Sequence, residues 1–224
     1  SRFGLLLDEH MGGARANARP VRAPTRDGEV ALFTGPSGAG KSTLLREAER
    51  ALRARGVRVV RLEGVALRDR PCVDLLGRSV DEAVRALARV GLGEAECFLR
   101  RPGELSDGQR WRLRLAMAID RATRDPAARA ALVIDECCAT LDPCSTLAAC
   151  ATLRRAVRRT PGLRALCAGA NMLLERALSP DVVVRVRAPG EARVERPALP
   201  EPTHADAGLS IDVAPAALRD YLGL

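Results

Sequence analysis

The sequence predicts an α/β protein in which a mostly parallel sheet is flanked by helices. Segments with strand and helix patterns alternate along the chain, as in proteins with parallel sheets. The run 130–134 is apolar throughout, as in a strand buried on both faces. A shorter apolar run, 29–34, is followed by a glycine-rich loop and then by a helical pattern. Because parallel strands need such crossovers, we expect helices on both faces of the sheet.

Local signals locate the elements of the first half. A helix over 41–55 is expected to end at Gly56, and the valine-rich segment 57–62 predicts a strand. Ser79 and Glu82 have capping-box spacing, which predicts the beginning of a second helix that ends near Val90.

The second half continues the alternation. A long helix is predicted over 106–124, after the break at Pro102, because its apolar residues recur at helical spacing. Pro143 suits the first turn of a helix over 143–159. The remaining expected elements are a strand over 163–167, a helix from about 171, a strand over 181–186 and an antiparallel partner strand ending near 196.

The composition is that of a globular protein, with 47% apolar and 29% charged residues. The sequence has no apolar run of the roughly 18 residues that a membrane span needs and no secretory signal pattern. We therefore expect a cytoplasmic protein with reduced thiols. Four of its seven cysteines lie close together in sequence, and we interpret them as small buried apolar residues, with a metal or redox site as the alternative: Cys137, Cys138, Cys144 and Cys150.

The net charge of +8 comes from 35 arginines and a single lysine. Arginine is abundant along the whole chain, so the charge by itself gives little support to nucleic-acid binding, which stays open. The basic residues of one predicted helix would share a solvated face: Arg154, Arg155, Arg158 and Arg159. The one lysine, Lys41, and the one glutamine, Gln109, both fall inside the motifs described next.

A phosphate-binding loop is predicted between the first strand and the first helix. The run 35–42 fits the pattern G-x-x-x-x-G-K-[ST], in which backbone N–H groups and the helix dipole bind phosphates. Lys41 would reach the β- and γ-phosphates, and Ser42 would ligate Mg²⁺. The expected nucleotide-binding residues are Gly35, Pro36, Ser37, Gly38, Ala39, Gly40, Lys41, Ser42 and Thr43.

Two acids follow the apolar run 130–134. Ligands bind at the carboxyl ends of parallel strands, so Asp135 and Glu136 should face the phosphate loop. We expect Asp135 to hold Mg²⁺ with Ser42, and Glu136 to act as the general base that polarises the attacking water.

Two further motifs resemble those of the ATP-binding cassette (ABC) ATPases. The run 105–109, Leu-Ser-Asp-Gly-Gln, is similar to that family's signature motif, and 139–142, Ala-Thr-Leu-Asp, resembles its D-loop. The resemblance covers roughly 28–196 and implies a P-loop NTPase fold that binds ATP and Mg²⁺. It also implies an ATP-dependent homodimer in which each chain supplies residues to the nucleotide of the other: Ser106, Asp107, Gly108, Gln109 and Asp142.

The sequence departs from that family in three places. The switch histidine is expected near Ala170 or Asn171, but the only histidines are His10 and His204. A Q-loop glutamine is missing between the phosphate loop and Gln109. No aromatic residue lies between Leu5 and Phe33, which leaves Phe3 or an arginine to contact the adenine. We therefore expect hydrolysis that is slow or that depends on a partner.

The resemblance places an ABC ATPase domain at 1–198, with a short helical subdomain at about 65–124, and a linker and tail at 199–224. Short motif strings are also similar to ABC ATPases fused to a predicted acetyltransferase, which makes a protein partner or a fused domain an expectation. The alternatives are a transporter's nucleotide-binding subunit, a regulatory module that binds ATP without hydrolysing it, and an ATP-gated nucleic-acid binder. The segment between phosphate loop and signature is short and has no glutamine, which argues against the transporter.

Overall fold

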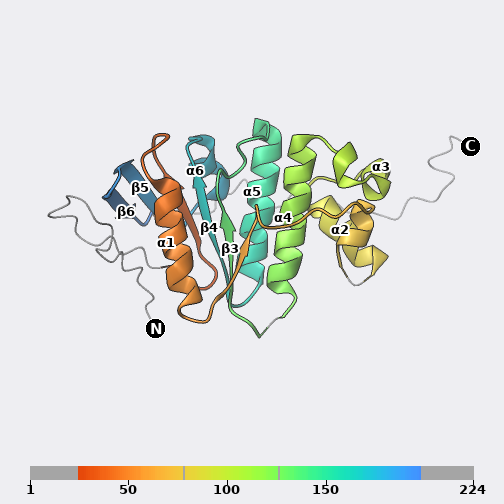
Figure 1. Cartoon of the computed structure of the whole chain (residues 1–224), viewed down its shortest axis with the longest axis horizontal. Coiled ribbons are helices and arrows are strands. Elements are labelled where there is room, and N and C mark those ends of the chain that lie inside the picture. Colours follow the sequence, from red (N-terminus) through yellow and green to blue (C-terminus); the bar gives the residue numbers. More distant parts are fainter. Residues whose placement is uncertain (1–24, 78, 126, 198–224) are drawn as a thin grey trace, which may run out of the picture.

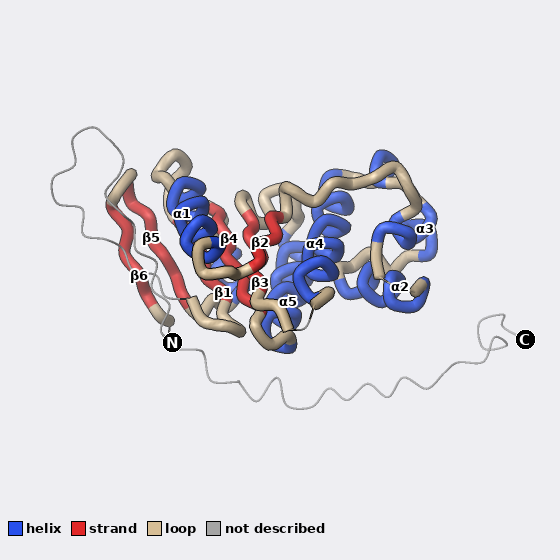
Figure 2. The backbone as a smooth tube through the Cα atoms, turned by 60° about the horizontal axis from the view of Figure 1, so that its bottom comes forward, coloured by secondary structure: helices blue, strands red, loops and turns tan. Residues whose placement is uncertain are grey.

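The computed structural model describes residues 25–77, 79–125 and 127–197, which form a six-stranded sheet in the order β2-β3-β4-β1-β5-β6. The strands through β5 pair in parallel, and β6 pairs antiparallel with β5 at the edge (Figure 2). The predicted fold class is therefore confirmed. The strands are β1 (Val30–Thr34), β2 (Arg58–Arg61), β3 (Ala130–Ile134), β4 (Leu163–Gly169), β5 (Val182–Ala188) and β6 (Glu191–Glu195).

The five predicted helices occur in the expected order with small changes at their ends, and one unpredicted helix, α3, lies among them. Among the described helices, none is long and apolar enough to cross a lipid bilayer. Figure 1 shows α2 and α3 beyond α4, at the far end of the molecule from β6. The helices are α1 (Lys41–Arg53), α2 (Val80–Arg89), α3 (Ala95–Leu99), α4 (Asp107–Thr123), α5 (Pro143–Arg159) and α6 (Leu173–Leu178).

The strand β3, which lies between β2 and β4, separates two layers of the core. Leu132 and Ile134 pack into the layer that contains residues of α2, α4, α5 and α6, whereas Ala131 and Val133 pack with residues of α1. Successive side chains of a strand point to opposite faces, so a strand covered on both sides must be apolar at every position. This is why the run 130–134 shows no alternation.

Three short elements between β2 and α4 were not predicted: η1 (Cys72–Leu75), α3 and η2 (Pro102–Glu104). Each is five residues or shorter, below the length at which helical periodicity is visible in a sequence. The expected break at Pro102 became the first turn of η2, in which the Glu104 side chain accepts a hydrogen bond from the Arg101 N–H at 2.6 Å. The subdomain boundary itself stays a prediction.

The expected stripe of four arginines on α5 is wrong at Arg154. Its guanidinium is bidentate on the Asp181 carboxylate, and its side chain is only 11% exposed. Asp181 lies just before β5 and also accepts the Val30 N–H at 2.8 Å, so the carboxylate is fixed at the sheet and draws Arg154 inward. The other three arginines of the group are exposed.

Several predictions fall outside the described residues. These are Phe3 as a contact for the adenine, the linker and tail at 199–224, and the positions of His10 and His204.

Candidate functional site

The predicted phosphate loop joins the end of β1 to the beginning of α1. Gly35 has φ +146°, and a Cβ atom there would lie 2.0 Å from the Val186 carbonyl oxygen of β5. Gly38 and Gly40 have φ +75° and +100°, a region that costs an L-residue energy. The loop therefore needs glycine at these positions for its shape and for its close contact with β5.

Lys41 closes this loop on itself. Its Nζ donates hydrogen bonds to the carbonyl oxygens of Gly35, at 2.9 Å, and of Pro36, at 2.6 Å. The ammonium thus lies over the concave side of the loop, where phosphate oxygens would bind. A compact ammonium with three donors fits between two carbonyls in a way that a planar guanidinium does not.

The two acids lie opposite the loop, as predicted. The Ser42 hydroxyl donates to Asp135 Oδ1 at 3.0 Å, so the two expected magnesium ligands are neighbours. Glu136 is exposed and has φ 47°, and its N–H donates to Asp135 Oδ1 at 3.1 Å. The left-handed turn costs about 1 kcal/mol or more. It is held by the Cys137 N–H, which donates to the Ala168 carbonyl of β4 at 2.7 Å.

Loop and acids line one cavity of about 620 Å³, a volume in the range of small-ligand sites. The cavity also contains Ala170 and Asn171, the positions at which a switch histidine was expected. The Asn171 side chain accepts a hydrogen bond from the Leu173 N–H at 2.9 Å, which fixes it at the start of α6. The lining residues are Ser37, Gly38, Gly40, Lys41, Ser42, Thr43, Asp135, Glu136, Cys137, Ala139, Ala168, Gly169, Ala170 and Asn171.

The signature-like segment lies outside this cavity, at the N-terminus of α4. Ser106 and Gln109 form a reciprocal capping box: Ser106 Oγ accepts the Gln109 N–H at 3.2 Å, and Gln109 Oε1 accepts the Ser106 N–H at 2.9 Å. Ser106 and Asp107 are exposed. None of the residues Ser106–Gln109 is among the described residues that line the phosphate-loop cavity.

The D-loop-like segment lies against the signature-like segment within the same chain. A Cβ atom on Gly108 would lie 3.3 Å from Leu141 Cδ2 and 3.6 Å from the Thr140 carbonyl oxygen. Asp142 caps α5 by accepting the Ser145 N–H at 2.9 Å. Hydrogen bonds with the side chain and then the backbone of Ser145 lower the pKa of Asp142, which keeps this exposed residue ionised.

Sequence analysis missed Glu63, which follows β2. The pairing of β2 with β3 places Arg61 beside Val133, and Glu63 Oε1 accepts the Asp135 N–H at 2.8 Å. Arg61 Nε lies 3.5 Å from the other carboxylate oxygen. A single acid after a short strand gives no sequence signal, because only the strand pairing brings it to Asp135.

The described residues offer oxygen donors that suit Mg²⁺ but no site made by protein alone. Among them, no group of three or more His, Cys, Asp or Glu side chains could hold a metal. Mg²⁺ is typically bound by one or two protein oxygens together with phosphates and water. The hydroxyl and carboxylate of Ser42 and Asp135, 3.0 Å apart beside the phosphate loop, fit that pattern.

Three of the four clustered cysteines are buried as expected, and Cys144 is exposed instead. The Cys137 and Cys138 sulfurs lie 3.7 Å apart, and those of Cys138 and Cys150 lie 3.9 Å apart. All three belong to the apolar core layer that contains residues of α4 and α5. Cys144 faces outward because it lies in the exposed first turn of α5.

A mostly parallel sheet with a glycine loop, the Lys41 ammonium and a serine–aspartate pair at its carboxyl edge defines a P-loop nucleotide-binding protein. A sequence model of the adenylylsulphate kinase family matches residues 27–97. That match ends before both Ser106 and Asp135, so it covers the phosphate loop without the other motifs.

Longer similarities extend beyond the loop. The chain is 29% identical to the phosphonates import ATP-binding protein PhnC of Hyphomonas neptunium, over 78% of this chain and 79% of that protein. It is 32% identical to the sn-glycerol-3-phosphate import ATP-binding protein UgpC of Salmonella typhi, over 61% of this chain and 44% of that protein. The fold matches a dimeric post-hydrolysis state of the ATP-binding cassette MJ0796 bound to ADP and Pi. In that match the TM-score is 0.59 and the identity 18%, with 86% of this chain and 95% of that chain covered. The chain thus resembles ATP-binding proteins of the ABC type in sequence and shares the fold of an ATP-binding cassette.

Proposed function

We propose that this chain binds Mg-ATP and hydrolyses it slowly, as a head-to-tail homodimer in which two chains enclose each nucleotide. The observation that carries the proposal is that, within one chain, the signature-like segment does not reach the phosphate-loop cavity. The phosphate loop and both acids line one cavity, while Ser106–Gln109 lie outside it, with Ser106 and Asp107 exposed. A second chain would supply the missing side of the site, and the cassette MJ0796, to which the fold is similar, forms a dimer in its ADP- and Pi-bound state.

Each residue has a role that follows from its position. Backbone N–H groups of 35–43 and Lys41 would bind the phosphates, and Glu136 would accept a proton from the attacking water. Five residues of each chain would approach the γ-phosphate of the partner's nucleotide: Ser106 (through Oγ), Asp107, Gly108, Gln109 and Asp142. The free N–H groups at the start of α4 make this end suited to an anion. Mg²⁺, when bound at Ser42 and Asp135, would neutralise phosphate charge.

Slow turnover is expected because the place of the switch histidine holds a short amide. Asn171 lies in the cavity, but its side-chain oxygen is engaged by the Leu173 N–H. An amide has no proton to exchange near neutral pH, unlike histidine.

Light scattering and phosphate release test this function together. With Mg-ATP the protein is expected to elute at twice its monomer mass and to release phosphate. With Mg-ADP, or with ATP and excess chelator, it should be a monomer. A protein that binds ATP but stays a monomer and releases no phosphate would instead be a module that holds ATP as a regulatory ligand.

The second candidate is the nucleotide-binding subunit of an importer, because both sequence relatives are import ATP-binding proteins. That function requires a membrane partner to bind the helices between β2 and α4. Stimulation of phosphate release by a co-purified membrane protein would support it. The cytoplasmic location and a fused or separate protein partner stay predictions.

Glu63 is proposed as a positioning residue for Asp135. Replacing it by alanine removes the acceptor of the Asp135 N–H, and we expect kcat to fall by about tenfold, the lower end for residues that support metal ligands. Glu63→Gln keeps an oxygen acceptor at the same place and should restore most of kcat.

The measurement is phosphate release as a function of Mg²⁺ concentration. Glu63→Ala should raise the Mg²⁺ concentration needed for half-maximal rate, whereas nucleotide affinity measured without Mg²⁺ should not change. A loss of affinity without Mg²⁺ in Glu63→Ala would show instead that the loop itself is disturbed.

A further inference from the structure

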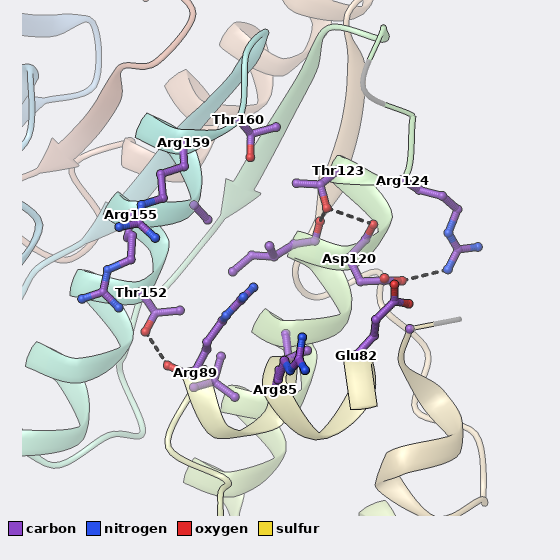
Figure 3. A pocket seen from close by; sticks show the side chains of 16 residues that line it. Glu82, Arg85, Arg89, Asp120, Thr123, Arg124, Thr152, Arg155, Arg159 and Thr160 are labelled. Atoms are coloured by element: carbon purple, nitrogen blue, oxygen red, sulfur yellow. Dashed lines mark hydrogen bonds and ion pairs between the residues drawn. The ribbon is translucent and has the colours of Figure 1, made fainter. Parts of the chain in front are cut away.

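A second cavity, also of about 620 Å³, lies between α2 and the C-terminal halves of α4 and α5. Residues of α2, α4 and α5 line it, and Figure 3 shows Arg89 extending from α2 into the space between α4 and α5, with Arg155 and Arg159 across from it on α5. The Thr152 hydroxyl donates to the Arg89 carbonyl at 2.6 Å and so ties α5 to the end of α2. The cavity is therefore held in shape by contacts between its walls.

The lining is strongly basic. Five arginines face two acids, a formal excess of three positive charges: Arg85, Arg89, Arg124, Arg155 and Arg159 against Glu82 and Asp120. Arginine near a helix C-terminus partly compensates the helix dipole, which amounts to about half a negative charge per helix. Three helix ends account for about one and a half charges, so the cavity keeps a net positive charge.

Carboxylates neutralise only part of the cluster. Arg124 forms an ion pair with Asp120 at 2.8 Å, and Arg85 lies 4.0 Å from Asp81. Within the described part of the chain, no ion pair joins Arg89, Arg155 or Arg159 to a carboxylate. By contrast, the neighbouring Arg154 is bidentate on Asp181. Three guanidiniums on two opposed helices thus share one cavity, and none of them forms an ion pair with a carboxylate of the described residues.

We propose that this cavity is a binding site for a small ligand that carries phosphate groups. The planar guanidinium binds phosphate oxygens through two parallel hydrogen bonds, and three of them can surround one diphosphate. The walls between the arginines include Ala86, Val90 and Ile119, which give an apolar surface to the rest of the ligand. The volume suits a small molecule rather than a helix or a duplex.

The site is separate from the nucleotide site. The two cavities have no lining residue in common. In Figure 1, α4 and α5 begin at the end of the sheet where α1 begins, and the basic cavity lies at their opposite ends. Ala116 is the first residue of α4 that lines this cavity, and it follows Ser106 by ten positions, so about 15 Å of helix separates the two.

The test is calorimetric titration with inorganic pyrophosphate in a Lys41→Ala background, which removes phosphate binding at the loop. The pocket variant carries Arg89→Gln, Arg155→Gln and Arg159→Gln. The control variant carries Arg46→Gln, Arg50→Gln and Arg176→Gln, three exposed arginines outside the cavity, so both variants lose the same charge. Circular dichroism and thermal unfolding check that both variants are folded. If the triple pocket variant is not folded, the single variant Arg155→Glu takes its place.

We expect the pocket variant, or Arg155→Glu, to bind pyrophosphate at least about tenfold more weakly, since each lost charge-assisted bond is worth about that factor. The control variant should stay within twofold of its parent. Absence of binding in the parent, or equal weakening in both variants, would overturn the proposal. Binding of a 20-base-pair DNA duplex that depends on the pocket arginines, without binding of pyrophosphate, would also overturn it. The cavity would then be part of a nucleic-acid surface.

Discussion

Replacing Glu136 by glutamine is expected to lower the rate of ATP hydrolysis by about two to four orders of magnitude, the usual contribution of a general base. Glu136 is exposed in the phosphate-loop cavity, directly after the proposed magnesium ligand Asp135. Glutamine has the same size and the same left-handed backbone preference as glutamate, so the turn at φ 47° is not disturbed. The substitution removes the proton acceptor and leaves the binding residues in place.

The same variant should accumulate as a dimer in Mg-ATP, because a nucleotide that is not hydrolysed keeps the two chains together. Light scattering with Mg-ATP, followed by a phosphate-release assay on the same sample, measures both effects. Glu191→Gln, at the exposed first position of β6, is the matched control and should behave as the parent. Hydrolysis by Glu136→Gln at the parental rate would exclude Glu136 as the base.

Replacing Lys41 by alanine is expected to weaken ATP binding by about a hundredfold or more. The variant loses the charge-assisted contacts to phosphate, each worth about 1.5 to 3 kcal/mol. It also loses the hydrogen bonds from Nζ to the Gly35 and Pro36 carbonyls, which hold the loop closed. Equilibrium binding of a fluorescent ATP analogue measures the loss, and Mg-ATP should then give no dimer.

Lys41→Arg separates charge from shape. Arginine keeps the positive charge, but its planar guanidinium is too wide for the position of Lys41 Nζ. That atom lies 2.9 Å from the Gly35 carbonyl oxygen and 2.6 Å from that of Pro36. We therefore expect Lys41→Arg to bind ATP more weakly than the parent by at least about tenfold. An arginine variant with parental affinity would mean that only charge matters at this position.

Much of the candidate nucleotide site could be predicted because each of its parts is a short continuous segment of the sequence. The phosphate loop is a continuous segment, and its glycines and lysine have fixed spacing. The apolar run 130–134 predicts a buried parallel strand, and the acids that follow such a strand must lie at the same edge of the sheet as the loop. The hydrogen bond from Ser42 to Asp135, residues 93 positions apart in sequence, is the outcome.

Glu63 and the basic cavity could not be predicted, for a different reason. Glu63 reaches Asp135 only because β2 pairs with β3 in one particular register. Arg89 and Arg155 belong to helices whose relative placement depends on packing in the core. Their spacing in the sequence carries no pattern, and among 35 arginines none stands out.

The sequence by itself determined the class of the fold, the order of its elements, the phosphate loop and the acids that face it, because these depend on short-range pattern and on the general rules of parallel sheets. The tertiary structure decided which distant side chains share a cavity. It turned Arg154 inward to Asp181, left Ser106–Gln109 outside the chain's own nucleotide cavity, and placed Arg89 opposite Arg155 and Arg159. Those contacts arise from the pairing of strands and the packing of helices, which act between residues that no local pattern connects.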